Sequence, residues 1–405
     1  MSREFDCVIV GAGLAGATLA VGLDTLGLSV ATVDARSRTP AAPGRDVRGL
    51  ALAPSSQRLL ATLGLWSTLA PHTTALKTIV ITDRGQFGST RLCAADVGVP
   101  ALGHVCPADQ LLGRLDAALT TLPGCTAYWQ STVGDIVAGP DAVTLTVSDG
   151  QAQTAVSARL LIAADGLHSA VRRHFDIAAT SRDYGQTAIV ANADVERPVP
   201  DTAFERFTRE GPLAVLPIGG ARVVIVRAAR TDEATGLMRL SDEAFLHDVR
   251  QRFGGRLGRF SALGERRSHP LILNRAQALH APRTVLIGNA ANTIHPNGAQ
   301  GLNLGLRDVA TLLDCVQMAL ARGEDPASTA VLEGYARRRR PDHDRTARFS
   351  DGLARVFGLD LGPVNVARGA ALLACDLLPP LKRALMWRLM GLRGETNRWL
   401  RAPQA

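Results

Sequence analysis

The chain has 405 residues, enough for two or three domains with a sizeable hydrophobic core. A hydrophobic content of 46% and a charged content of 20% are ordinary for a folded globular protein and exclude extensive disorder. The net charge is +8 at pH 7, but the basic residues gather late in the chain and not on an aromatic-rich module. Nucleic-acid binding is therefore disfavoured against a solvated helix face or attraction to an anionic membrane surface.

Six scattered cysteines form no C-x-x-C pair and have no metal-ligand spacing. We therefore expect reduced thiols and no metal site. The first apolar strand runs directly into glycines, without the pattern of a cleaved leader, and no run of about 18 apolar residues follows anywhere. These features predict a cytoplasmic protein, with peripheral contact at the inner face of the cytoplasmic membrane left open.

The N-terminal segment 5–34 reads as strand, GxGxxG, helix, strand and acid. The residues that carry this pattern are Gly11, Gly13, Gly16 and Asp34. The first glycine permits a tight turn, the second allows a pyrophosphate to approach the backbone, and the third lets the helix pack closely on the strand. The helix N-terminus offers N–H groups to phosphates, and the acid can accept hydrogen bonds from a ribose. The complete unit favours dinucleotide binding over a plain turn, without separating NAD from FAD.

Two later segments also place small or polar residues between a strand and a helix. The first, LLIAADGLHSAVRR at 160–173, contains Asp165 and Gly166. The second, VLIGNAANTIHPNGAQGLNLGLRD at 285–308, contains Gly288, Asn289, Pro296, Gly298, Gly301, Leu302 and Asn303. Either segment alone is compatible with a helix cap and a tight turn. Backbone N–H groups at 301–303 would lie at a helix start, where an isoalloxazine or ribityl oxygen can bind.

Together, the three ordered segments resemble the class A flavoprotein aromatic hydroxylases, over residues of about 5 to 345. The resemblance implies noncovalent FAD, NAD(P)H as a transient reductant, and hydroxylation of an activated ring with O2. The stretches GNAANTIHP, FERFT, GPLAVLP and DVRGLALA are similar to the ubiquinone-biosynthesis hydroxylases. Within that branch the sequence most resembles enzymes that convert a 2-polyprenyl-6-methoxyphenol into the 1,4-benzoquinol.

Other interpretations remain open at this point. They are a different ring position or aromatic substrate, a flavin-bound scaffold in a ubiquinone-biosynthesis complex, and a flavin reductase acting on prenyl double bonds. The resemblance places Arg48 near the isoalloxazine or its entrance, although a surface arginine is nearly as compatible. It places Gln110 near the ribityl chain, and Asn289 where the family more often has aspartate. His295, the titratable residue of the flavin-loop motif, is either a catalytic residue or a side chain that fixes the loop.

The predicted fold class is α/β, with a discontinuous Rossmann-like FAD-binding domain, an antiparallel β-sheet substrate domain and a C-terminal helical segment. The three flavin motifs lie far apart, which makes the first domain discontinuous. Its expected segments are 1–75, 102–180 and 275–345. The substrate domain takes 76–101 and 181–274, with strands at 78–82, 90–92, 186–193 and 211–227. Residues 346–405 form the C-terminal part, with helices at 364–378 and 380–392 that either pack against the FAD domain or dock on a membrane.

Overall fold

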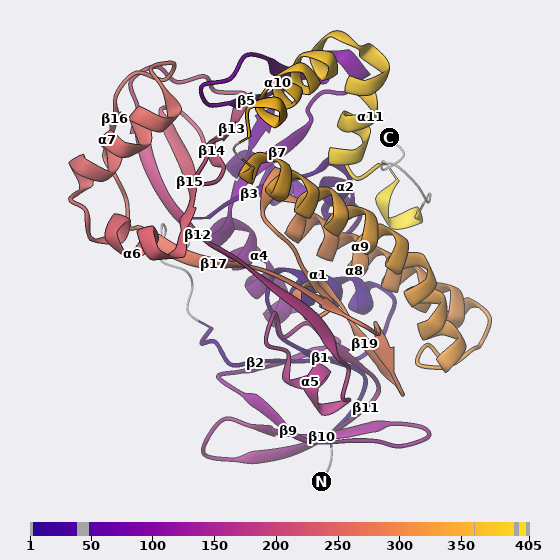
Figure 1. Cartoon of the computed structure of the whole chain (residues 1–405). Helices are drawn as coiled ribbons and strands as arrows, with labels where there is room; N and C mark the ends of the chain where they lie inside the picture. The colour runs from indigo at the N-terminus through magenta and orange to yellow at the C-terminus, as the bar shows by residue number, and fades with distance from the viewer. Residues whose placement is uncertain (1–2, 39–47, 360, 393–396, 402–405) are drawn as a thin grey trace.

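The computed structural model describes residues 3–38, 48–359, 361–392 and 397–401. A mainly parallel sheet forms its lower part (Figure 1). The order in this sheet is β18-β19-β11-β1-β2-β8, and β10 and β9 extend from β11. The strands are β1 (Arg3–Val10), β2 (Val30–Asp34), β8 (Cys125–Trp129), β9 (Thr132–Ala138), β10 (Val143–Ser148), β11 (Gln153–Ala163), β18 (His280–Ala281) and β19 (Thr284–Leu286).

The central strand β1 has apolar side chains on both faces. This allows both faces of the strand to be buried under helices or loops. Ile9 pairs with Ile162 on one side and Thr32 on the other, and its side chain is fully buried. Such a continuous apolar run is typical of a strand within a parallel sheet. The helices of this part are α1 (Leu14–Thr25), α4 (Ala108–Thr121), α5 (Ala170–His174), α8 (Gln300–Ala321) and α9 (Thr329–Gly358).

A nine-stranded sheet forms the second layer, in the order β20-β17-β12-β15-β14-β13-β5-β6, with β16 beside β12. Except for the parallel pair β13–β5, its neighbours are antiparallel. Its strands are β5 (Thr78–Asp83), β6 (Ser89–Cys93), β12 (Ala179–Val195), β13 (Thr202–Phe207), β14 (Leu213–Pro217), β15 (Arg222–Arg230), β16 (Phe260–Ser261), β17 (Arg267–Ala276) and β20 (Asn292–Thr293).

One face of this sheet is covered by two helices not expected from the sequence, α6 (Thr231–Arg239) and α7 (Asp242–Phe253). Phe245 and Val249 of α7 are buried among apolar residues of the sheet. The opposite face lines a cavity, described below. The predicted strands at 78–82, 90–92, 186–193 and 211–227 fall within this sheet, the last of them divided between β14 and β15.

A three-stranded sheet connects the two parts, in the order β3-β7-β4. Its strands and the neighbouring helices are β3 (Gly49–Leu52), β4 (Thr74–Leu76), β7 (Gly103–Pro107), α2 (Pro54–Thr62) and α3 (Trp66–Leu69). Short 3-10 helices complete the fold, namely η1 (Ala70–His72), η2 (Ala94–Val97), η3 (Gly288–Ala290), η4 (Asn297–Ala299) and η5 (Arg398–Leu400).

The C-terminal helices α10 (Gly362–Leu377) and α11 (Pro379–Leu389) lie at the top of the view, on the β5–β6 hairpin (Figure 1). The hydroxyl of Thr90 on β6 donates to the Leu372 carbonyl at 2.7 Å, and the Arg91 N–H donates to Asp376 at 2.8 Å. The helices therefore pack mainly on the antiparallel sheet. They also contact the part with the parallel sheet: Arg368 of α10 donates to the Val356 carbonyl of α9 at 2.9 Å, and the Met390 carbonyl, just after α11, accepts from the Ser55 N–H at 3.3 Å.

The predicted α/β fold class is confirmed, and several elements cross the expected boundaries between segments. Strand β12 begins at Ala179, and β20 belongs to the substrate sheet although it lies within the segment assigned to FAD. Helix α9 runs through Pro341 to Gly358 and so crosses the expected segment boundary at residue 345. A helix-internal proline costs about 3 kcal/mol. Neighbours of Pro341 on α9 bind buried partners on α8, and these contacts offset that cost.

Candidate functional site

The N-terminal glycines differ in what a side chain would meet at each position. Gly11 has a φ of +97°, and a Cβ there would lie 2.4 Å from the Ala164 carbonyl oxygen. A Cβ on Gly16 would lie 1.9 Å from the Gly11 carbonyl oxygen, so α1 contacts the β1 turn directly. A Cβ on Gly13 would have no neighbour within 4 Å. Two of the glycines therefore allow the chain to close on itself, while the backbone at Gly13 faces open space.

Asp34 closes this turn from the end of β2. One of its carboxylate oxygens accepts from the Ala12 N–H at 2.7 Å, and the other accepts from the Arg36 N–H at 2.9 Å. Arg36 in turn donates to both carboxylate oxygens of Asp116 on α4, and its Nε lies 3.5 Å from Asp34. A carboxylate has about four lone-pair sites, so Asp34 keeps capacity for a ribose hydroxyl.

The Asp165–Gly166 turn follows β11 and contacts the Gly11 turn. Asp165 caps α5, with one oxygen accepting from the Ala170 N–H at 2.7 Å. Its other oxygen is buried and has no hydrogen-bond partner within the described ranges of the chain. Gly166 has a φ of +82° and open space around it. Arg172 of α5 donates to the carbonyls of Leu167 at 2.9 Å and Ala290 at 2.8 Å, and thereby ties this turn to the later glycine loop.

The Gly288–Asn289 turn rests on a buried ionic cluster. The Gly288 N–H donates to Asp308 of α8 at 3.0 Å. Asp308 also accepts from Arg339 and His343 of α9, both at 2.7 Å. Burial alone would raise the pKa of Asp308, but His343 and Arg339 outweigh it and lower the pKa. Asn289 itself is exposed and borders the cavity.

The loop at Pro296–Asn303 leads into α8 and borders the same cavity. Gly298 has a φ of +67°, and a Cβ on Gly301 would meet nothing within 4 Å. The Asn303 side chain is buried, accepts from the Ala53 N–H at 2.8 Å and the Ser56 hydroxyl at 2.7 Å, and donates to two carbonyls. Its amide is therefore used within the protein. Gly301 and Leu302 are not among the residues that line the cavity.

His295 lies behind this loop and does not line the cavity. It is fully buried, its Nδ1 accepts from the Asn297 N–H at 3.3 Å, and its Nε2 lies 3.3 Å from Gln186 Oε1. The Ser350 hydroxyl donates to its carbonyl at 2.7 Å. Burial lowers the pKa of His295 to about 4. This environment favours the interpretation that His295 fixes the loop over a catalytic role.

Arg48 and Gln110 flank the junction between β7 and α4. Arg48 is exposed, borders the cavity, and its carbonyl accepts from the Ala108 N–H at 3.0 Å. Asp46 and Val47, which precede it in the motif, lie outside the described residues. Gln110 Oε1 accepts from Arg114 at 3.0 Å, and the side chain is not part of the cavity wall.

A cavity of about 590 Å³ lies between the flavin-motif loops and the substrate sheet. Its floor is formed by apolar residues of the sheet, and its roof by α9, α10 and α11. Phe357 of α9 stacks on Phe207 of β13 at 3.6 Å between ring centroids, and Arg368 of α10 binds the buried Asp83 of β5 at 2.9 Å. Glu205 of β13 supplies a carboxyl to this otherwise apolar floor.

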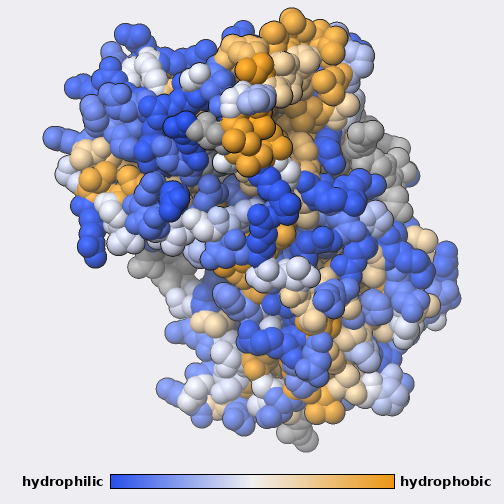
Figure 2. Space-filling view, viewed as in Figure 1, coloured by the Kyte–Doolittle hydropathy of each residue, from blue (hydrophilic) through white to orange (hydrophobic). Residues whose placement is uncertain are grey.

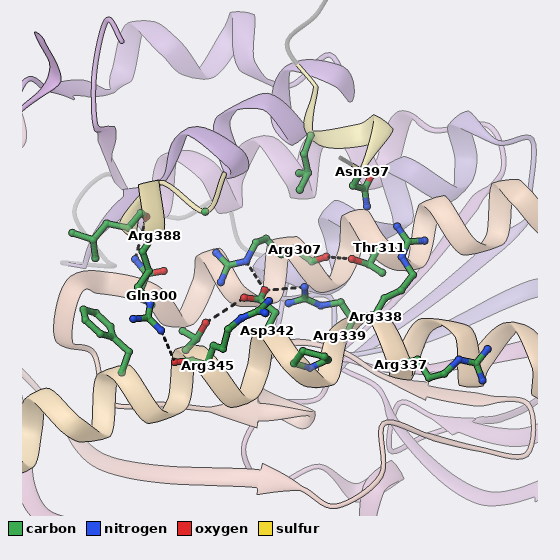
Figure 3. Close-up of a pocket in the computed structure, with 16 residues that line it drawn as sticks. Gln300, Arg307, Thr311, Arg337, Arg338, Arg339, Asp342, Arg345, Arg388 and Asn397 are labelled. Atoms are coloured by element: carbon green, nitrogen blue, oxygen red, sulfur yellow. Dashed lines mark hydrogen bonds and ion pairs between the residues drawn. The ribbon is translucent and has the colours of Figure 1, made fainter. Parts of the chain in front are cut away.

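A second hollow, of about 740 Å³, lies on the other side of Gln300, Phe349 and Leu389, which border both spaces. Figure 3 shows arginines of α8, α9 and α11 around it. Arg307 and Arg339 both bind Asp342, at 2.8 and 2.9 Å. The lining arginines are Arg307, Arg337, Arg338, Arg339, Arg345 and Arg388, and we call the hollow the arginine groove.

The model of the FAD binding domain family matches residues 4–350. The chain belongs to this family. It is 37% identical to the ubiquinone hydroxylase UbiL of Rhodospirillum rubrum, over 95% of this chain and 89% of that one. It is 28% identical to the 3-demethoxyubiquinol 3-hydroxylase of Escherichia coli, over 96% and 100% of the two chains.

Solved structures share the fold of this flavoprotein at lower identity. The p-nitrophenol 4-monooxygenase PnpA of Pseudomonas putida superposes with a TM-score of 0.80 at 17% identity, covering 98% of this chain and 100% of that one. The Diels-Alderase PyrE3 superposes with a TM-score of 0.75 at 22% identity, covering 97% and 81%. Since one fold carries both names, the fold alone does not determine the reaction.

The prediction of an FAD-dependent aromatic monooxygenase of the ubiquinone-hydroxylase branch is confirmed, with FAD as its cofactor and NAD(P)H as the reductant typical of the family. The open backbone at Gly13 and the unpartnered Asp165 oxygen fit a dinucleotide. When bound, FAD supplies the oxygen-activating chemistry. The protein binds and orients the cofactor and the substrate and controls proton transfer to and from them.

Several residues that organise the site were not singled out from the sequence. They are Arg36, Arg172, Asp308, Arg339 and His343. Each is a charged or titratable side chain that lies near a glycine motif or on a helix packed against such a motif. This position in the sequence is only a weak signal of a role in the site. Only their burial and their partners across the fold reveal their role.

Proposed function

We propose that this flavoprotein hydroxylates the ring of a polyprenylated phenol in ubiquinone biosynthesis, using NAD(P)H and O2. The observation that carries the proposal is the cavity of about 590 Å³, which extends from the flavin-motif loops to the apolar C-terminal helices. A ring can lie at the flavin end while an apolar tail leaves between α10 and α11. The names of the two curated relatives described above support the same substrate class.

The proposed cofactor site uses the three glycine-bearing segments. The backbone at Gly13 and the start of α1 take the pyrophosphate, and Asp34 takes the adenosine ribose. Asp165, Gly166 and Gly288 surround the pyrophosphate and ribityl chain. The cavity edge at Arg48, Asn289, Pro296 and Gly298, with the N–H groups at 301–303, takes the isoalloxazine. Gln110 remains a candidate for the ribityl chain if it releases Arg114.

The ring position is the finer part of the proposal. We favour para-hydroxylation of a 2-polyprenyl-6-methoxyphenol to the 1,4-benzoquinol, because the hydroxyl and methoxy groups both enrich the ring in electrons. Another ring position is the main alternative, and the E. coli relative is named for position 3.

Deletion of the gene tests both the proposed substrate class and the proposed ring position. The strain should lose ubiquinone and accumulate a prenylphenol that lacks one ring hydroxyl, as identified by mass spectrometry and NMR. Normal ubiquinone would contradict the proposed pathway, and an intermediate that lacks a different hydroxyl would contradict only the ring position. Purified protein should oxidise NAD(P)H faster when a prenylphenol is added. A scaffold subunit would bind FAD without this stimulation, and a prenyl reductase would yield a saturated tail.

We also propose that α10 and α11 dock this enzyme on an anionic membrane, from which the substrate enters. Apolar side chains gather on these helices in the upper part of Figure 2. Leu361 is 57% exposed, Leu377 66% and Leu378 52%. Among the described residues no single helix is long and apolar enough to span a membrane, and α10 with α11 meets such a test only as a pair bent by 93°.

Positive charge beside this apolar face suits an anionic surface. The arginine groove adjoins α11, and Arg345 of this groove is exposed. The Arg307 Nη1 atom in the groove is buried and has no hydrogen-bond partner among the described residues. A lipid phosphate could bind there while the apolar residues of α10 and α11 enter the bilayer.

Vesicle sedimentation tests the docking proposal. Wild-type protein should bind phosphatidylglycerol-containing vesicles more tightly than pure phosphatidylcholine vesicles. The double variant Leu377→Ser/Leu378→Ser should bind about 10-fold or more weakly, since each exposed leucine contributes about 1.5 kcal/mol or more when buried. Val137→Ser, on the exposed strand β9, is the matched control. Equal binding by the double variant and the wild type would contradict docking through these helices.

A further inference from the structure

Glu205 lies on the cavity floor. It lies on β13 between Ile81 of β5 and Ala214 of β14 in the sheet register. The same row continues through Val226 of β15 to Val190 of β12. All five residues line the cavity. The carboxyl therefore projects from an apolar row of the sheet into the space that we assign to the substrate.

The Glu205 carboxyl has no counter-charge paired with it in the part of the chain that the structure describes. Among the described residues, it makes no hydrogen bond or ion pair. Burial raises its pKa to about 7 and is the sole cause of the shift. The side chain is half-buried by area because it faces the cavity and not another packed layer. The titratable or charged groups that share the cavity wall are Arg48, His269 and Cys375. A buried ion pair, Asp83–Arg368, lies beside Phe207 on the same sheet.

A carboxyl in such surroundings costs stability unless a ligand provides a hydrogen bond. Leucine or glutamine would fill the same volume at lower cost. The position therefore calls for an explanation outside the folded protein itself. A phenol hydroxyl is a donor of suitable acidity, and it enters the cavity with an apolar ring that the surrounding valines can contact.

We propose that Glu205 binds the substrate's phenol hydroxyl, with its carboxylate accepting the hydrogen bond and then the proton. The inference rests on the proposed function, because it takes a phenol as the substrate. The phenol O–H bond breaks, an O–H bond forms on the carboxyl, and the electron pair stays on the phenol oxygen. The ring becomes richer in electrons at its ortho and para carbons. The proton returns to the phenol oxygen before the product leaves, so Glu205 is regenerated.

This role also fixes the orientation of the ring. With the hydroxyl held at β13, the ring is anchored between the flavin-motif loops and the helical roof. The apolar tail is then directed toward α10 and α11, where Leu372, Leu385 and Leu389 line the cavity. Glu205 would thus act on both reactivity and substrate position.

Two substitutions separate the parts of this role. Glu205→Gln keeps the shape but cannot take a proton, and Glu205→Leu removes the hydrogen bond as well. Glu233→Gln, on the exposed start of α6, is the matched control. FAD content and thermal melting show that each variant is folded. The probe is a short-chain 2-prenyl-6-methoxyphenol that stays in solution.

We expect Glu205→Gln to lower kcat/KM by about 100-fold, the lower range for a positioned proton acceptor. The wild-type rise in kcat/KM as pH increases through about 7 should disappear. Ultraviolet difference spectra should show that bound phenol ionises at a higher pH in wild-type protein than in Glu205→Gln, because a neighbouring carboxylate that accepts the hydrogen bond opposes a second negative charge. Glu205→Leu should additionally bind the phenol at least 10-fold more weakly.

Two results would overturn the inference in distinguishable ways. If the wild type hydroxylates the phenol, and both variants keep its kcat/KM, pH profile and affinity within twofold, Glu205 has no such role and the proposed function survives. If the wild type neither binds nor hydroxylates a prenylphenol, the proposed function fails and the assignment of Glu205 fails with it.

Discussion

The FAD-binding part and the substrate cavity use opposite kinds of construction. In the first, glycines allow backbone contacts so close that a Cβ at Gly16 would lie 1.9 Å from a carbonyl oxygen. A buried cluster around Asp308 then holds the loops. In the second, side chains from many elements enclose an apolar space whose acidic member, Glu205, has no partner among the residues that the structure describes. The cofactor end is thus determined by backbone geometry, and the substrate end by side chains brought together over long distances.

The largest expected effect comes from two substitutions within the same glycine motif. Gly16→Val should destabilise the fold by more than about 4 kcal/mol, because the new side chain overlaps the backbone at Gly11. Gly13→Val should leave the fold intact, because no protein atom lies within 4 Å of its Cβ, yet weaken FAD binding at least 100-fold. Thermal melting and flavin content measure the two effects. Full flavin occupancy in Gly13→Val would show that the pyrophosphate lies elsewhere.

Removal of a charge from the ionic cluster should come next. Arg339→Leu leaves the fully buried Asp308 with one partner fewer, and breaking a buried pair costs about 3–5 kcal/mol. Because the pKa of Asp308 is lowered in the fold, its stabilising contribution is present above about pH 4 and is lost as the pH falls. Urea unfolding at several pH values measures both effects.

The matched control for this variant is Arg337→Leu on the same helix, whose exposed ion pair with Glu333 contributes about 0.5 kcal/mol or less. An Arg339→Leu protein as stable as this control would show that the cluster does not hold the loops.

In contrast to Arg339→Leu, Glu205→Gln should raise the stability of the fold. The pKa of Glu205 is raised in the fold, so the unfolded chain loses its proton first as the pH rises, and the fold becomes less stable between about pH 4.5 and 7. The substitution removes this penalty. Water in the cavity makes this penalty smaller than for a fully dry site. We expect the free energy of unfolding to rise by about 1–3 kcal/mol at pH 8 and almost not at all at pH 4.

Urea unfolding of Glu205→Gln and wild type at these two pH values provides the measurement. A loss of stability at pH 8 would mean that the carboxylate has a favourable partner within the protein.

The smallest effect is expected at Arg48, at the border of the two regions. Arg48→Ala should slow flavin reduction or weaken FAD binding by about 3- to 10-fold, equivalent to about 1 kcal/mol. Stopped-flow reduction and fluorescence titration provide the measurements. Arg322→Ala, at the distant end of α8, is the control. Unchanged values in both assays would place Arg48 on the surface beside the site and not in it.

The sequence by itself determined the strand, glycine-turn and helix order of the three flavin segments, and with it the fold class and cofactor. These features are local: a glycine with a positive φ or an apolar strand can be recognised from its neighbours in the chain. The helices over 362–377 and 379–389 were likewise predicted to within a few residues, because their apolar periodicity and prolines are local signals.

Only the tertiary structure decided which side chains meet. Asn303 binds Ala53 and Ser56, and Arg368 of α10 binds Asp83 of β5, each across about 250 or more residues of chain. It also decided that α9 continues through Pro341, that β20 joins the substrate sheet, and that His295 is enclosed behind its loop. In the sequence, Glu205 is not distinguishable from other strand residues. Only the sheet register shows that its side chain points toward the cavity. Burial and partnership depend on segments far apart in sequence, and local patterns carry no information about them.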